Sequence, residues 1–172
     1  MPEVGSEHAA AATPSPAHPG VPFLQRCLLV DLEVTLRGRI THVGAILGDQ
    51  RRSGTAATGL EFLDALAGLA DAVIGHNIVE HDLPRLQATS AEHPLLQLPA
   101  IDTLVLSPLT FPANPYHRLV KDYKLVRESS NDPLADARLA GSLFLDEWEA
   151  LARLRTTHPD LFSALHHLLA TT

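Results

Sequence analysis

The sequence predicts an α/β domain built on a mixed β-sheet that is flanked by helices. Two apolar runs near the start are joined by a short Arg-Gly-Arg turn, which is typical of an antiparallel hairpin. Beyond this hairpin, strand-like apolar runs alternate with segments whose apolar residues recur at helical spacing. The chain of 172 residues is long enough to bury the hydrophobic core of one domain.

Two regions of the chain differ in composition. Residues 1–22 are rich in Ala, Pro, Ser and Gly and lack periodicity, so we expect a disordered or linker arm there. Residues 23–172 carry the alternating pattern and are predicted to form the domain.

The predicted elements follow in order along the chain. Apolar runs predict strands over residues 23–34, 39–47, 72–77 and 98–103. Helical spacing predicts helices over residues 58–71, 79–88, 132–154 and 158–170, and a short helix or turn is expected over residues 116–125. Thr58 is expected to cap the first of these helices, and Pro84 lies in the first turn of the second. Asp132 is expected to cap the third, ahead of Pro133.

The charge and the apolar pattern argue against some classes of protein. A net charge of −7 is unusual for a protein that reads nucleic-acid sequence, but not for an enzyme whose acidic site is neutralised by metal ions. No apolar run reaches membrane-spanning length, and the N-terminus lacks the pattern of a signal peptide. Because Cys27 is the single cysteine, no internal disulfide can form, and we expect a cytoplasmic protein without a membrane segment.

Two acidic residues lie two positions apart in the first predicted strand. Side chains alternate between the faces of a strand, so Asp31 and Glu33 point the same way. Neighbouring bare carboxylates repel each other and are costly to bury. A positive group should therefore lie between them, or they should lie at the open end of the strand.

Two further acids lie on the apolar faces of predicted helices. Asp136 shares a face with Leu143, seven residues later, and Asp82 lies three residues after Val79 and four before Leu86. An acid that is turned inward needs a partner, and hard oxygen ligands suit Mg²⁺ or Mn²⁺. Two such ions can clamp the attacking and leaving oxygens of a phosphodiester.

Three segments in chain order carry a resemblance to a known family. The segments VDLEV, IGHNIVEHDLPRL and NDPLADARLAGSLF resemble the three motifs of the DEDD (DnaQ-like) 3′–5′ exonucleases, which have a ribonuclease-H-like fold. The resemblance covers most of residues 25–147. In detail the chain looks most like the exonuclease domains that are fused to bacterial RecQ-like helicases.

The resemblance implies a ribonuclease-H-like mixed sheet and an exonuclease domain over residues 23–172. By this resemblance Asp31, Glu33, Asp82 and Asp136 would hold two Mg²⁺ or Mn²⁺ ions. The domain would hydrolyse phosphodiester bonds at the 3′ end of DNA or RNA and release nucleoside monophosphates. The implied partners are nucleic-acid 3′ ends, with single-stranded DNA favoured over RNA, and a helicase domain or partner.

One position departs from the family pattern. Relatives carry the general base as a His five residues before the last Asp, or as a Tyr four residues before it. Here these positions are Asn131 and Asp132. An amide cannot take a proton from water at neutral pH, so Asn131 could only orient it. The alternative function is therefore a catalytically weak or inactive nucleic-acid-binding domain of a larger DNA-processing protein.

Residues in and beside the first two motifs are implied to contact the substrate. Leu32, Val34 and Thr35 would line the pocket for the terminal nucleotide. His76 and Asn77 follow a predicted strand, and Asn77 would either cap the next helix or contact the terminal sugar.

A basic cluster lies between the second and third motifs. It includes Lys121 and Lys124, which would contact phosphates or else belong to a solvated helix face. His117 is a candidate replacement for the missing base. Asp102 ends a predicted strand and is interpreted as structural.

Overall fold

The computed structural model describes residues 18–117 and 132–171. The strands in this part of the chain are β1 (Cys27–Val34), β2 (Ile40–Leu47), β3 (Gln50–Thr55), β4 (Ala72–Gly75) and β5 (Ala100–Asp102). The α-helices are α1 (Val21–Leu24), α2 (Ala56–Ala67), α3 (Leu83–Thr89), α4 (Thr103–Thr110), α5 (Pro133–Thr157) and α6 (Pro159–Thr171). A π-helical turn, η1 (Ile78–Asp82), precedes α3, and a 3-10 helix, η2 (Pro94–Gln97), follows it.

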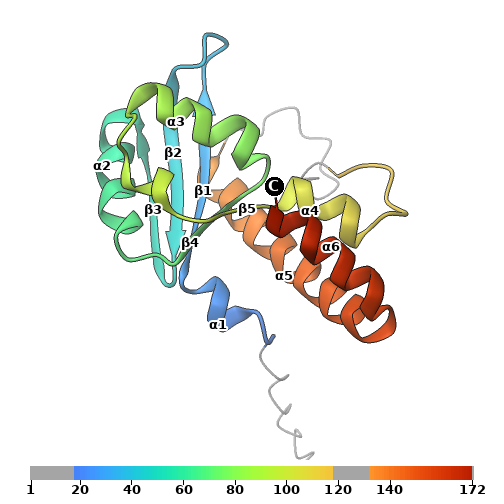
Figure 1. Cartoon of the computed structure of the whole chain (residues 1–172). Coiled ribbons are helices and arrows are strands. Elements are labelled where there is room, and N and C mark those ends of the chain that lie inside the picture. Colours follow the sequence, from blue (N-terminus) through green and yellow to red (C-terminus); the bar gives the residue numbers. More distant parts are fainter. Residues whose placement is uncertain (1–17, 118–131, 172) are drawn as a thin grey trace, which may run out of the picture.

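The strands form one mixed sheet in the order β3-β2-β1-β4-β5. The first three strands are antiparallel neighbours, whereas β4 and β5 run parallel to β1. Figure 1 shows the sheet between α2 and α3 on one side and α5 with α6 on the other. The predicted α/β class with a mixed, helix-flanked sheet is therefore confirmed.

Strand β1 divides the core between the two faces of the sheet. Leu28, Val30 and Leu32 face the cluster that α2 and α3 complete, whereas Cys27 and Leu29 face the cluster that α5 completes. Alternation continues along the strand, so the next side chains on the α5 face are those of Asp31 and Glu33. The two acids thus extend an apolar row toward the end of the strand.

Helix α5 covers its face of the sheet with a continuous buried stripe. The stripe runs along Pro133, Ala137, Ala140, Phe144 and Glu147. Helices α4 and α6 pack against α5 on the side away from the sheet (Figure 1). Asp132 caps the N-terminus of α5 by accepting the backbone N–H groups of Leu134 and Ala135, so the predicted cap is confirmed.

The N-terminal boundary of the first strand was predicted too early. Residues 21–24 form the short helix α1, which Pro22 opens, and β1 begins only at Cys27. The ring of Phe23 packs against Phe144 and Trp148 of α5. Residues 18–22, which were assigned to the arm, therefore belong in part to the fold, and residues 1–17 lie outside the described residues.

Two elements of the sheet edge differ from the prediction. Strand β3 was missed because its side chains are almost all exposed and polar, and it is defined by its backbone pairing with β2 across the Gly48-Asp49 turn. The strand predicted over residues 98–103 is shorter, because the Asp102 side chain accepts the N–H of Leu104 and starts helix α4. Residues 118–125 of the predicted short helix or turn lie outside the described residues.

Of the two predictions for the N-terminal ends of α2 and α3, one is confirmed. Helix α2 begins at Ala56, so Thr58 lies inside the first turn and the prediction that it is the cap was wrong. Pro84 does lie in the first turn of α3, as predicted.

No helix within the described ranges is long and apolar enough to cross a membrane.

Glu147 is a buried carboxyl within the α5 stripe. Its residue is 0% exposed, and neither carboxylate oxygen has a hydrogen-bond partner in the part of the chain that the structure describes. Burial, followed by the negative charges of Asp102 and Asp146, raises the pKa of Glu147 to about 8.

This carboxyl should make the fold less stable as the pH rises. The folded state retains the Glu147 proton up to about pH 8, whereas the unfolded chain releases it near the ordinary value of 4.5. The cost is therefore absent below pH 4.5, grows between pH 4.5 and 8, and is complete above that window. Glu147→Gln should match wild type in urea unfolding at low pH and be the more stable chain at pH 8.

Glu61→Gln, on the exposed face of α2, is the matched control and should not change the pH profile. Parallel profiles for wild type and Glu147→Gln between pH 4 and 9 would contradict the buried position of this carboxyl.

Candidate metal centre

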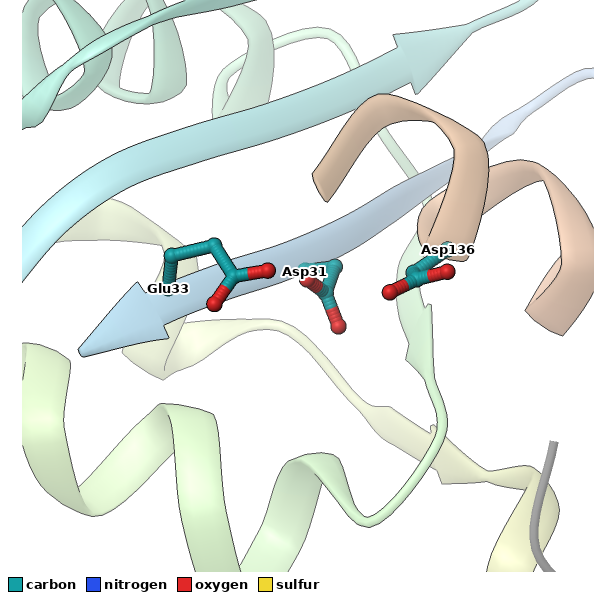
Figure 2. A group of neighbouring side chains, drawn as sticks. All are labelled: Asp31, Glu33 and Asp136. Carbon is teal, nitrogen blue, oxygen red and sulfur yellow. The ribbon is translucent and has the colours of Figure 1, made fainter. Parts of the chain in front are cut away.

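Three of the predicted acids meet at one place in the fold. One carboxylate oxygen from each of Asp31, Glu33 and Asp136 lies within 4.8 Å of the other two. Figure 2 shows the first two side chains leaving β1 and the third leaving the first turn of α5 toward the same space. All three residues are half-buried, so the group is accessible from one side.

Two local features of the chain bring these carboxylates together. The alternation of β1 places Asp31 and Glu33 on the face that α5 covers. Helix α5 starts at Pro133, so Asp136 lies in its first turn, where the N-terminal end of the helix dipole favours a carboxylate. The end of β1 and the start of α5 thus bring three carboxylates together in one place.

Asp82 is not a member of this group, although it lies near Asp31. It is 3% exposed, and its Oδ1 accepts the backbone N–H of Leu32 at 2.8 Å. Burial, followed by the negative charge of Asp31, raises the pKa of Asp82 to about 8. Its other oxygen lies 3.7 Å from Nδ1 of His81. Its predicted role as a metal ligand stays a prediction.

The helical faces assigned to Asp82 and Asp136 are confirmed only in part. Asp82 ends the π-helical turn η1, whose wider spacing leaves Val79 43% exposed instead of beside Asp82. Asp136 and Leu143 are both half-buried, at the border of the stripe formed by Ala137, Ala140 and Phe144. The inward face that Asp82 was predicted to share with Leu86 is confirmed, since both residues are buried, and only the pairing with Val79 was wrong.

The residues after β4 form a turn that hydrogen bonds to Asp102 hold in place. Asn77 has a left-handed backbone with φ of 64°, and its N–H donates to Oδ1 of Asp102 at 2.8 Å. Oδ2 of Asp102 accepts the N–H of Val79, which supports the interpretation of Asp102 as structural. Asn77 does occupy the N-cap position before η1, but in the described chain its side chain makes no capping bond.

His76 is tied to the start of α4. Its Nδ1 lies 2.9 Å from Oγ1 of Thr103, and the Thr103 hydroxyl donates to the carbonyl of Gly75. Nδ1 of His76 is therefore the donor in this pair. Burial lowers the pKa of His76, which favours the neutral ring.

The residues predicted to line a nucleotide pocket have different environments. Leu32 is buried in the core on the α2 side, so its side chain does not face the acids. Val34 is half-buried at the end of β1. Thr35 is exposed, and its hydroxyl accepts the N–H of Arg39 in the turn to β2. Of the three, Val34 and Thr35 lie at the open end of the strand.

Several predicted site residues cannot be placed in the fold. Asn131, Lys121 and Lys124 lie outside the described residues, so the water-orienting and phosphate-binding roles stay predictions. His117 is described, and its Nδ1 lies 3.1 Å from Oγ of Ser107 in α4.

Comparisons with known proteins add no identification. A scan against protein-family models finds no match, and a search of curated proteins finds none either.

The donor set of this centre fits a hard divalent cation. Asp31, Glu33 and Asp136 offer only carboxylate oxygens, which Mg²⁺ and Mn²⁺ prefer. After burial, the negative charge of Asp31 is the next cause that raises the pKa of the neighbouring Asp82. Groups of exposed acids are also common without an ion, so the arrangement permits metal binding but does not identify the metal.

The bond between Asp82 and Leu32 gives Asp82 a structural role that can be tested separately. Asp82→Asn keeps an oxygen acceptor for the buried N–H of Leu32, whereas Asp82→Ala leaves that donor unsatisfied. In metal-chelating buffer, urea unfolding should show Asp82→Ala to be less stable than Asp82→Asn by ~1–3 kcal/mol. Equal stability of the two variants would show that this hydrogen bond does not support the strand.

Proposed function

We propose that the chain is a metal-dependent 3′–5′ exonuclease with a ribonuclease-H-like fold. The observation that carries this proposal is the convergence of Asp31, Glu33 and Asp136, which come from the first and third motifs and lie about 100 residues apart in the sequence. The mixed sheet in the order β3-β2-β1-β4-β5, with helices on both faces, is compatible with that fold.

Asp31, Glu33 and Asp136 would hold the metal, and Asp82 would complete the set of ligands. When bound, two Mg²⁺ or Mn²⁺ ions supply Lewis-acid activation of water and neutralise the charge that develops on the phosphodiester. Asp82 has a second task in the chain itself, because it fixes the backbone of Leu32 between the two acids of β1. Val34 and Thr35, at the end of the same strand, would contact the terminal nucleotide.

Asn131 would stand where relatives have a proton-accepting His. It would orient water through its amide without accepting a proton. The same substitution favours the second candidate, a weak or inactive nucleic-acid-binding domain. The retained carboxylate group favours the active enzyme, because binding of nucleic acid alone would gain nothing from concentrated negative charge.

The proposed substrate is a single-stranded DNA 3′ end, with RNA as the second choice. Lys121 and Lys124 would contact its phosphates, and a helicase domain or partner would supply the single strand. This assignment is consistent with a cytoplasmic protein.

The chain should release nucleoside monophosphates from a 5′-labelled oligonucleotide in the presence of Mn²⁺. A 3′-phosphate or a closed circle should resist, because a pocket at Val34 and Thr35 would need a free 3′ hydroxyl. Asp31→Asn should lower the rate by at least ~10²-fold, because it removes one of the charges that stabilise the metal. The lengths of the remaining oligonucleotides on denaturing gels measure cleavage by wild type, the resistance of the two blocked substrates and the rate of the Asp31→Asn variant.

Asp49→Asn, in the exposed turn between β2 and β3, is the matched control and should leave the rate unchanged. Cleavage of the circle would show an endonuclease. No cleavage by wild type of either DNA or RNA, together with oligonucleotide binding, would favour the inactive binding domain.

A further inference from the structure

Gly44 lies where the backbone of helix α5 comes close to the sheet. It is buried in β2, directly opposite Asp31 of β1 in the antiparallel register. A methyl group at Gly44 would lie 2.3 Å from the carbonyl carbon of Pro133 and 2.4 Å from the backbone nitrogen of Leu134. Carbon atoms in contact are ordinarily ~3.5–4.0 Å apart, so any side chain here would collide with the helix.

The atoms that Gly44 would meet belong to the backbone of the first turn of α5. A side chain can rotate away from such a collision, but a helix backbone moves only if the whole turn moves. The same turn carries Asp136, whose N–H donates a hydrogen bond to the carbonyl oxygen of Asp132 at 3.0 Å. The separation between the sheet and this turn therefore sets the distance of Asp136 from Asp31 and Glu33.

We propose that Gly44 is a positioning residue for the metal centre, because its missing side chain lets the first turn of α5 bring Asp136 to the two acids of β1. This role rests on the proposed function, since it concerns the geometry of that same centre. Gly44 contacts neither substrate nor metal and would act only through the position of Asp136.

Another glycine on the opposite face provides a matched control. A methyl group at Gly59 of α2 would lie 2.5 Å from Cγ2 of Val43, the neighbour of Gly44 in β2. Gly59→Ala should thus press on the same strand through the Val43 side chain, from the side that lacks the acids. It should lower the thermal midpoint without changing the affinity for Mn²⁺.

The test is titration of the full chain with Mn²⁺, followed by electron paramagnetic resonance, without substrate. Gly44→Ala should bind Mn²⁺ ~10–100-fold more weakly than wild type, the usual effect of disturbing the groups that orient metal ligands. In nuclease assays the Mn²⁺ concentration for half-maximal rate should rise by a similar factor, while the rate at saturating Mn²⁺ recovers. A loss of stability alone would not produce this recovery.

Ala137→Val is a second substitution that should push α5 away from the sheet, and it is used if Gly44→Ala does not fold. Ala137 is 0% exposed, follows Asp136 directly and packs on the sheet through side chains that can adjust. Ala137→Val should weaken Mn²⁺ binding several-fold for the same reason. Unchanged affinity in whichever of the two variants folds would overturn the role of Gly44 alone. Absence of Mn²⁺ binding by wild type would instead overturn the proposed function, and this role with it.

Discussion

Electrostatic repulsion among carboxylates at the end of β1 is the constraint on which the structure of the site depends. Oxygens of three acids lie within 4.8 Å of one another, and Asp82 is buried close behind Asp31. Two like charges 4 Å apart cost about 4 kcal/mol at an effective dielectric constant of about 20. Packing elsewhere must offset this cost. The backbone of α5 lies close to the sheet at Gly44, next to this group.

The two buried aspartates beside the site, Asp102 and Asp82, differ in their hydrogen bonds. Asp102 accepts three backbone N–H groups, from Asn77, Val79 and Leu104, so it anchors the turn after β4 and the start of α4. Asp82 accepts the N–H of Leu32, and burial raises its pKa to about 8. The first arrangement is a structural cap, whereas the second leaves a buried carboxyl that retains its proton up to about pH 8.

The mixed sheet and the pair of acids on β1 could be predicted because strand alternation and helical spacing act over a few residues. Strand β3 could not, since its polar side chains carry no apolar pattern and only backbone pairing defines it. The inward position of Asp82 could be predicted from its spacing to Leu86, but the exposure of Val79 could not, because a π-helical turn breaks the regular spacing there. Gly44 and Glu147 were missed because their importance arises from contacts between segments distant in sequence. A glycine within a strand and a glutamate late in a long helix were the only local signals.

The central claim is that Asp31, Glu33 and Asp136 jointly hold divalent cations. Anomalous scattering from crystals of the full chain soaked in Mn²⁺ tests it most directly, because it locates the metal without relying on activity. The account predicts Mn²⁺ bound by oxygens of all three carboxylates, at the ~2.0–2.6 Å typical of such ligands. Ordered carboxylates with no anomalous density among them, at Mn²⁺ concentrations that saturate binding in solution, would contradict it.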